Sequence, residues 1–401
     1  METSPHHHDQ NNAQDDYIVF GAPQIEDDDV AEVVDSLRSG WLGTGPKVAA
    51  FEEQFRRYIG CDHAVALNSC TAGLHLSMLA AGLKPGDEVI TTPMTFCATV
   101  NTILHVGATP VLVDCDRATC LIDPQRIEDA ISPRTRAIVP VHLCGRPCNM
   151  EAMMDIAQRH DLIVIEDAAH AIEATYNGRK VGNISHFTCF SFYVTKNVIT
   201  GEGGMVTTNN PDFAARIKMY GLHGMSHDAW ARYSDNGYKH YAVLFPGFKY
   251  NMMDIQAAIG IHQLKRVEPN WQRRQQIWAL YNEAFADLPV GLPAPVEPNT
   301  RHAHHLYTLF IDEERCGLAR DQFIHELHKR GIGAGVHYVS VHLHPYYQQT
   351  FGYQPSDFPN ARWISERTVS IPLSPRLTDE EVARVIEGVR GNQDGRPYTK
   401  G

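Results

Sequence analysis

The chain has 401 residues, of which 43% are hydrophobic and 20% are charged. These values are typical of a globular protein with room for two or three domains, and they exclude a wholly disordered, collagen-like or coiled-coil chain. The 35 Lys and Arg residues against 47 Asp and Glu residues give a net charge of −12. That sign is wrong for a protein that binds a phosphate backbone, so we expect no nucleic-acid partner.

The N-terminus and the cysteines indicate a cytoplasmic protein. No apolar run approaches the ~18–20 residues of a membrane span, and residues 1–16 are polar, which predicts a disordered leader rather than a signal peptide. The nine cysteines are scattered through apolar segments, as expected for reduced, buried thiols. His6–His8 could bind a metal, but Cys144 and Cys148 have no second pair at zinc-site spacing, and we predict no metal centre.

Between residues 62 and 210 the sequence alternates between short apolar runs and helix-like stretches. The runs predict strands at Ala64–Leu67, Glu88–Ile90, Val111–Asp114, Ala137–His142, Leu162–Glu166 and Phe187–Phe192. The stretches between them predict helices at Thr71–Ala81, Cys97–His105, Pro124–Ile131 and Met150–His160. Apolar strands with helical crossovers are typical of an α/β fold with a mostly parallel sheet, in which ligands bind at the carboxyl ends of the strands.

The last third of the chain has a different pattern and predicts a smaller α+β domain. Its expected elements are a helix at Leu264–Asp287, a Pro-rich linker at Leu288–Pro298, a strand at His305–Ile311, a helix at Arg320–Arg330, an aromatic and His-rich segment at Gly335–Tyr347, and a helix at Thr378–Val389. We therefore divide the chain into a leader over residues 1–16, a large domain with an N-terminal arm over 17–265, and a small domain over 266–401.

A dinucleotide site of the Rossmann type is the first functional alternative for such a sheet. It requires G-x-G-x-x-G directly after a strand. The segment Gly43–Gly45 lacks the third glycine and follows no strand, and the sequence contains no P-loop. The sequence therefore argues against both nucleotide-binding motifs.

Two of the predicted strands end in groups that suit a cofactor. Ser69, Cys70 and Thr71 open a helix after the first strand, where free backbone N–H groups bind a phosphate well, although Ser69 could also be an ordinary N-cap. Asp167 follows the fifth strand, with His170 three residues later. A cap or a salt bridge is the usual explanation, but such an Asp could also hold a proton on a ring nitrogen.

A lysine follows the sixth strand. Lys196 lies between this strand and the Gly-rich turn Gly201–Gly204, where burial would lower its pKa and allow it to form a Schiff base; an exposed surface lysine is the alternative. Phe96 follows the second strand and could lie on the face of a ring. A phosphate cup, an acid for a ring nitrogen, a lysine and a stacking aromatic are together the requirements of pyridoxal phosphate (PLP).

With these residues in place, the sequence resembles the fold-type I, PLP-dependent nucleotide-sugar aminotransferases of the DegT/StrS group. The resemblance spans about residues 18 to 385 and is carried by Ser39–Pro46, Asn68–Gly73, Glu166–His170, Ser191–Gly204 and Lys249–Asn251. It is strongest to the members that make UDP-4-amino-4-deoxy-L-arabinose. That likeness rests on His223-Gly224, Asp228–Trp230, Gly335–Tyr338, His342, Tyr346 and Tyr347.

The resemblance implies a role for each of these site residues. Lys196 would carry the cofactor, Asp167 would pair with its ring nitrogen, and His170 would lie near its ring hydroxyl. The phosphate would lie among Ser69, Cys70, Thr71 and Ser191, with Phe96 stacked on the ring and Asn251 reaching the phosphate of the neighbouring subunit. His337, Tyr338 and His342 are expected beside the sugar, with Trp41 and Glu202 as weaker candidates.

The implied activity is that of a homodimer with shared active sites. It would move the amino group of glutamate to a keto-sugar nucleotide, at C4 of a UDP-linked sugar. Lys196 argues against the dehydratase branch of the family, which has His in its place. Two alternatives remain open: another keto substrate, such as a 3-keto sugar, a keto-inosose or a keto-octulosonate, and a catalytically silent regulatory protein on the same fold.

Overall fold

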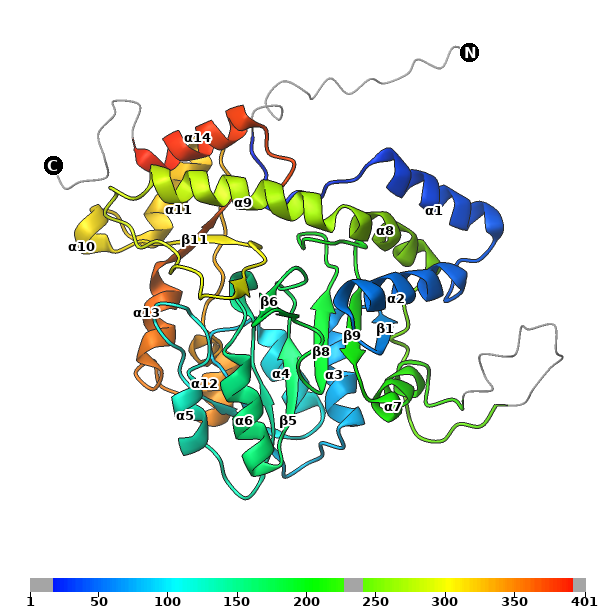
Figure 1. Cartoon of the computed structure of the whole chain (residues 1–401). Helices are drawn as coiled ribbons and strands as arrows, with labels where there is room; N and C mark the ends of the chain where they lie inside the picture. The colour runs from blue at the N-terminus through cyan, green and yellow to red at the C-terminus, as the bar shows by residue number, and fades with distance from the viewer. Residues whose placement is uncertain (1–16, 227–240, 392–401) are drawn as a thin grey trace, which may run out of the picture.

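A computed structural model describes residues 17–226 and 241–391 of the chain (Figure 1). The expected leader, His6–His8 and the segment Asp228–Trp230 lie outside the described residues. Within the described residues, no helix is long and apolar enough to cross a membrane.

A seven-stranded sheet forms the centre of the molecule, with the strand order β1-β9-β8-β5-β4-β2-β3. Its strands are β1 (His63–Leu67), β2 (Glu88–Thr91), β3 (Thr109–Leu112), β4 (Thr135–Val139), β5 (Ile163–Asp167), β8 (Phe187–Ser191) and β9 (Gly204–Thr208). Only β9 is antiparallel to its neighbours, so β1, β5 and β8 end at the same edge. This sheet confirms the predicted α/β fold with a mostly parallel sheet.

Helices cover both faces of this sheet (Figure 1). One face packs against α3 (Cys70–Ala80), α4 (Cys97–His105) and α7 (Pro211–Gly221). The other face packs against α2 (Pro46–Ile59), α6 (Met150–His160) and α8 (Asp254–Lys265), while α1 (Asp27–Ser39) packs on α8 and α5 (Pro124–Asp129) lies beside α6. Neighbouring strand residues such as Val164 and Ile165 enter different clusters because side chains alternate between the faces.

The C-terminal part of the chain builds a separate apolar cluster around α9 (Val267–Ala284) and a two-stranded sheet. The remaining elements are β11 (Tyr307–Phe310), α10 (Glu313–Cys316), α11 (Arg320–Lys329), α12 (Pro345–Phe351), α13 (Pro359–Arg367), β12 (Thr368–Ile371) and α14 (Asp379–Arg390), with β6 (Thr175–Tyr176), β7 (Arg179–Lys180) and β10 (Thr300–Arg301) in a small third sheet. Ile18 of the N-terminal arm joins this cluster, whereas Val341–Ile364 contributes to the core of the large sheet. The boundary between residues 265 and 266 remains a proposal.

The helix expected over Leu264–Asp287 is divided in the structure. Helix α8 ends at Lys265, and α9 begins at Val267 after a single residue, Arg266. Pro269 lies in the first turn of α9 and has no N–H to donate to the carbonyl of Lys265, so one continuous helix cannot run through this point. Strand β9 and helices α1 and α2 were not predicted from the sequence.

Candidate active site

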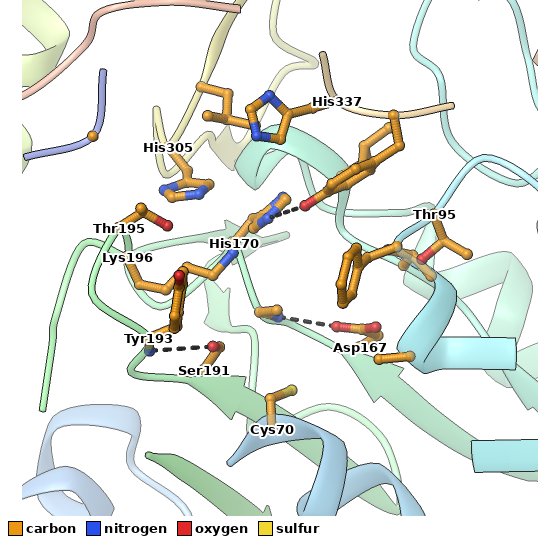
Figure 2. A pocket seen from close by; sticks show the side chains of 18 of the residues that line it. Cys70, Thr95, Asp167, His170, Ser191, Tyr193, Thr195, Lys196, His305 and His337 are labelled. Atoms are coloured by element: carbon orange, nitrogen blue, oxygen red, sulfur yellow. Dashed lines mark hydrogen bonds between the residues drawn. The ribbon is translucent and has the colours of Figure 1, made fainter. Parts of the chain in front are cut away.

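A cavity of about 560 Å³ opens at the edge of the sheet where β1, β5 and β8 end. Residues from the ends of these strands line it, together with Phe20–Gly21 of the N-terminal arm and Gly335–Tyr338 of the C-terminal part of the chain. Figure 2 shows Cys70 at the start of α3, Asp167 at the end of β5 and Lys196 after β8 around one space, with His170 between them and His337. The topology therefore brings together the groups that the sequence placed at separate strand ends.

The start of α3 forms a cradle of backbone N–H groups. Ser69, Cys70 and Thr71 line the cavity, and the Ser69 hydroxyl caps the helix by accepting from the backbone N–H of Ala72 (3.0 Å). A Cβ at Gly204 would lie only 2.4–2.5 Å from the backbone of Ser69 and Cys70, so a residue without a side chain is needed where β9 packs on this helix start. Such a helix start binds a phosphate through its free N–H groups and its dipole.

Two neutral side chains lie beside this cradle. Burial raises the pKa of the Cys70 thiol well above its usual value, so the thiol adds no charge next to a bound anion. Ser191 ends β8 and also lines the cavity, with its hydroxyl accepting from the backbone N–H of Tyr193 (3.4 Å). Gly204 of β9 pairs with both Leu67 and Ser191, so the end of β8 lies one strand away from the end of β1, which leads into α3.

Asp167 is a buried carboxylate at the end of β5. Its Oδ2 accepts from the Thr99 hydroxyl (2.8 Å) and its Oδ1 accepts from the backbone N–H of Ala169 (3.2 Å). Burial raises the pKa of Asp167, and these hydrogen bonds, with the charge of Lys196, counter it only partly. A cation in this place, such as a protonated ring nitrogen, would stabilise the carboxylate.

Lys196 lies on the turn after β8 and reaches into the cavity (Figure 2). The turn is held by a hydrogen bond from its backbone N–H to the carbonyl of Tyr193 (2.8 Å). Burial lowers the pKa of Lys196 to about 8, although nearby Cys70 and Asp167 oppose the shift. About a tenth of the amine is therefore neutral at pH 7 and about half at pH 8, which supplies the neutral form that a nucleophile or base requires.

His170 and Tyr338 form a hydrogen-bonded pair on the opposite wall. The backbone N–H of Cys144 donates to Nδ1 of His170 (3.2 Å), so in the neutral ring the proton is on Nε2, which faces the Tyr338 hydroxyl at 3.1 Å. Burial lowers the pKa of His170 well below its usual value, which favours this neutral form. The Tyr338 hydroxyl thus accepts from His170 and keeps its own proton for a ligand.

Two further aromatic side chains lie in the same cavity. Phe96 remains 56% exposed although it lines the cavity, and its ring centroid is 5.7 Å from that of Tyr338. His337 lies between Phe20, whose ring stacks on it at 5.4 Å, and Ser370, whose hydroxyl is 2.9 Å from its Nδ1. Glu202 also lines the cavity. These positions are open to a ligand that enters from the solvent side.

Three expected site residues do not line this cavity. His342 has no exposed surface, bonds to Ser340 through Nδ1 (2.8 Å) and packs edge-on against Phe358 (4.9 Å between centroids). The expectation that His342 faces a substrate is therefore corrected, because its ring is in the core. Asn251 donates to the Thr44 hydroxyl (2.6 Å), and Trp41 is 50% exposed. Asn251 is also not the N-cap of α8, which is Met253.

Sequence reasoning missed several residues that line the cavity or support its groups. Thr99 bonds to Asp167 and to Thr95 (2.7 Å), and the four-residue spacing of these two threonines at the start of a helix was the available signal. His305 and Phe20 come from distant parts of the chain. No local pattern marks these two, because only the tertiary structure brings them to this edge.

The donor set fits PLP. The buried Asp167 needs a cationic partner, the Lys196 amine has a lowered pKa, and the α3 cradle suits a phosphate. Across the described ranges no cluster of three or more His, Cys, Asp or Glu side chains could hold a metal ion.

Comparison with known proteins points the same way. The sequence pattern of the DegT/DnrJ/EryC1/StrS aminotransferase family matches residues 23–390. The spore coat polysaccharide biosynthesis protein SpsC of Bacillus subtilis (strain 168) is 50% identical over 93% of this chain and 96% of its own. The PMP form of the putative sugar aminotransferase Spr1654 from Streptococcus pneumoniae superimposes with a TM-score of 0.86 at 34% identity, over 92% and 96% of the two chains. DesV of S. venezuelae, solved with a ketimine intermediate, gives a TM-score of 0.82 at 36% identity, over 90% and 93%.

Proposed function

Starting from the fact that the chain belongs to the DegT/DnrJ/EryC1/StrS aminotransferase family, we propose that this PLP-dependent sugar aminotransferase moves the amino group of glutamate to C4 of a UDP-linked 4-keto sugar. The observation that carries the proposal is the meeting of Lys196, Asp167 and the start of α3 in one cavity. The choice of C4 and of a UDP-linked sugar rests on the resemblance to the UDP-4-amino-4-deoxy-L-arabinose enzymes, one part of which, Gly335–Tyr338, lines the opposite wall.

When bound, PLP supplies an aldehyde that takes up the amino group and a ring that withdraws electrons from the reacting carbon. The N–H groups at the start of α3 bind the phosphate. The Asp167 carboxylate holds a proton on the ring nitrogen, and its burial strengthens that charge-assisted contact. Phe96 lines the cavity beside Tyr338, where its ring would cover one face of the cofactor ring.

Lys196 acts as the base and acid of the reaction. Its amine would take a proton from the carbon that bears the amino group and deliver it to the former aldehyde carbon of the cofactor, on the other side of the transferred nitrogen. A pKa of about 8 suits both tasks, because the amine can lose and regain a proton near neutral pH. His170 and the Tyr338 hydroxyl lie where a polar group of the ring or of the substrate would be bound.

We propose a homodimer in which Asn251 and Trp41 complete the site of the partner. Neither residue lines the cavity of its own chain. The Nδ2 of Asn251 donates one of its two protons to the Thr44 hydroxyl, so the second can be donated to a phosphate in the partner's site. Trp41 presents a half-exposed aromatic surface near the same region, since it packs beside Gly45 while Thr44 bonds to Asn251.

The product would enter a cell-surface polysaccharide, lipid A or a related glycan. The name of the B. subtilis relative, which refers to spore coat polysaccharide, supports this use of the product. The nine cysteines are all unpaired, which suits a reducing compartment such as the cytoplasm.

A substrate panel tests the proposal. The purified enzyme, after conversion by L-glutamate, is mixed with UDP- and dTDP-linked 4-keto and 3-keto sugars, a keto-inosose and a keto-octulosonate, and return of the visible absorption of PLP is followed together with the product mass. We expect the fastest return with a UDP-linked 4-keto sugar. A faster return with any other member would overturn the assignment of the substrate. The Lys196→Ala variant should bind PLP but show no transfer.

A further inference from the structure

A buried charged pair lies behind the turn that carries Lys196. Glu173, before β6, and Arg274, in α9, form an ion pair in which both side chains are almost completely buried, at 0% and 1% exposure. Arg274 Nη2 donates to Oε1 of Glu173, and Nε and Nη1 of Arg274 have no other hydrogen-bond partner among the described residues. The guanidinium therefore depends on Glu173, and it leaves the second carboxylate oxygen free for another donor.

That second oxygen holds the neighbour of the catalytic lysine. Asn197 Nδ2 donates to Oε2 of Glu173 (2.9 Å) and to the carbonyl of Ala303 (3.2 Å). Both contacts are acceptors, so the nitrogen of the amide must face them and its oxygen must face the other way. Glu173 thus fixes which way the Asn197 amide points.

The direction of the amide fixes the proton of a cavity histidine. Asn197 Oδ1 is 2.9 Å from Nδ1 of His305, and an amide oxygen can only accept, so the proton of neutral His305 is on Nδ1. His305 Nε2 is then an acceptor. The His305 ring lines the cavity and packs on the His170 ring, with 4.3 Å between centroids.

We propose that Glu173, anchored by Arg274, is a positioning residue for the aminotransferase reaction: through Asn197 it fixes the turn that carries Lys196 and sets His305 as a hydrogen-bond acceptor in the active site. This proposal needs the aminotransferase activity but not the identity of the sugar. The proposal also gives α9 a part in the active site, because this helix carries Arg274, which holds Glu173 in place.

Two matched double variants separate this role from a packing role. Glu173→Gln with Arg274→Met removes both charges but keeps an acceptor for Asn197, whereas Glu173→Met with Arg274→Met removes the acceptor as well. The side chains are similar in volume, and replacing both members of a buried pair avoids leaving one charge alone. Glu88→Met with Arg134→Met removes an ion pair at the amino end of β2, away from the cavity, and serves as the control.

The first measurement is hydrogen exchange of the full chain freed of cofactor. The amides of Lys196 and Thr200 are bonded to the carbonyls of Tyr193 and Phe192 and report the turn. We expect the Met pair to exchange up to about tenfold faster at these amides, the effect of losing one hydrogen bond. The Gln pair and the control should exchange like the wild type.

The second measurement is the rate at which L-glutamate removes the visible absorption of the PLP-loaded enzyme. We expect about a tenfold lower limiting rate in the Met pair and a nearly unchanged half-saturating donor concentration, with the Gln pair close to wild type. If glutamate is not the donor, only this measurement fails and the exchange difference remains. If the folded Gln and Met pairs have the same exchange rates and the same limiting rate, the role of the acceptor is overturned. This holds whether both pairs resemble the wild type or both are impaired.

A single variant covers the case in which the Met pair does not fold. Asn197→Leu removes the amide but leaves the Glu173–Arg274 pair in place. It should show the same faster exchange and the same lower limiting rate. Wild-type exchange and rate in Asn197→Leu would contradict the proposal by themselves.

Discussion

The Asp167→Asn substitution tests most directly whether the charge of this carboxylate contributes to the reaction. It removes one charge from a buried position at nearly constant volume. A hydrogen bond to a charged group contributes about 1.5–3 kcal/mol, and each ~1.36 kcal/mol changes a rate tenfold. If the contact is strongest in the charged states of the reaction, the rate should fall about 10- to 150-fold.

The fold should survive this change. Thr99 donates to Oδ2 of Asp167 and also bonds to Thr95, and a hydroxyl can accept as well as donate, so it can turn to accept from the new amide. The backbone N–H of Ala169 still finds an oxygen on the side chain. No buried donor needs to lose its partner.

The pH dependence of stability gives an independent check in the chain without cofactor. Burial raises the pKa of Asp167 above its ordinary value of 3.8, so the folded chain holds a proton that the unfolded chain has already released. The carboxylate therefore lowers the free energy of unfolding at pH values above about 4. We expect Asp167→Asn to be at least as stable as the wild type at pH 7, with the difference shrinking towards pH 4.

The assay mixes the PLP-loaded variant with L-glutamate in a stopped-flow instrument and follows the loss of visible absorption. Thr99→Val, which removes one hydrogen bond but keeps the carboxylate, is the control and should lose much less activity. Wild-type rate in Asp167→Asn would refute the role of the carboxylate. A large loss of thermal stability would refute the argument that the fold accommodates the amide.

Three further predictions follow from the geometry. Lys196→Met should raise the free energy of unfolding of the cofactor-free chain at pH 7, because the folded wild type must bury a charged amine. Burial lowers the pKa of this amine from 10.5 to about 8, so the gain should fade between pH 8 and 10.5, and urea unfolding at several pH values measures it. Mixing Lys196→Ala chains with Asn251→Ala chains should restore about a quarter of the sites in a two-fold dimer with a shared site, and no recovery after verified exchange would rule that site out. Asp254→Ala should cost about 2–4 kcal/mol in chemical unfolding, because this buried carboxylate accepts three backbone N–H groups from residues 45–48 at the start of α2, and a change under 1 kcal/mol would contradict that account.

The sequence by itself determined the class of fold and which groups meet at one edge of its sheet. Alternating apolar runs and amphipathic helices predicted six strands of the central sheet, and their boundaries lie within a few residues of those observed. Parallel strands must end at one edge, so Lys196, Asp167 and the start of α3 could be placed together without knowing the tertiary structure. These predictions succeeded because local periodicity and strand ends are properties of short segments.

Only the tertiary structure decided which distant residues reach that edge. His342 and His337 lie in the same aromatic segment, yet the first packs in the core against Phe358 and the second faces the cavity. The segment has no regular period that could separate them. Their different positions follow from how residues 335–343 pass between the small two-stranded sheet and the large one.

The network behind the active site was equally invisible in the sequence. Glu173, Asn197 and Arg274 are separated by up to 101 positions and come from two separate turns and helix α9. Each alone is an ordinary polar residue. Burial makes them act together, because a charge removed from water must find its partners inside the protein, and only the fold, which brings α9 beside these two turns, supplies them.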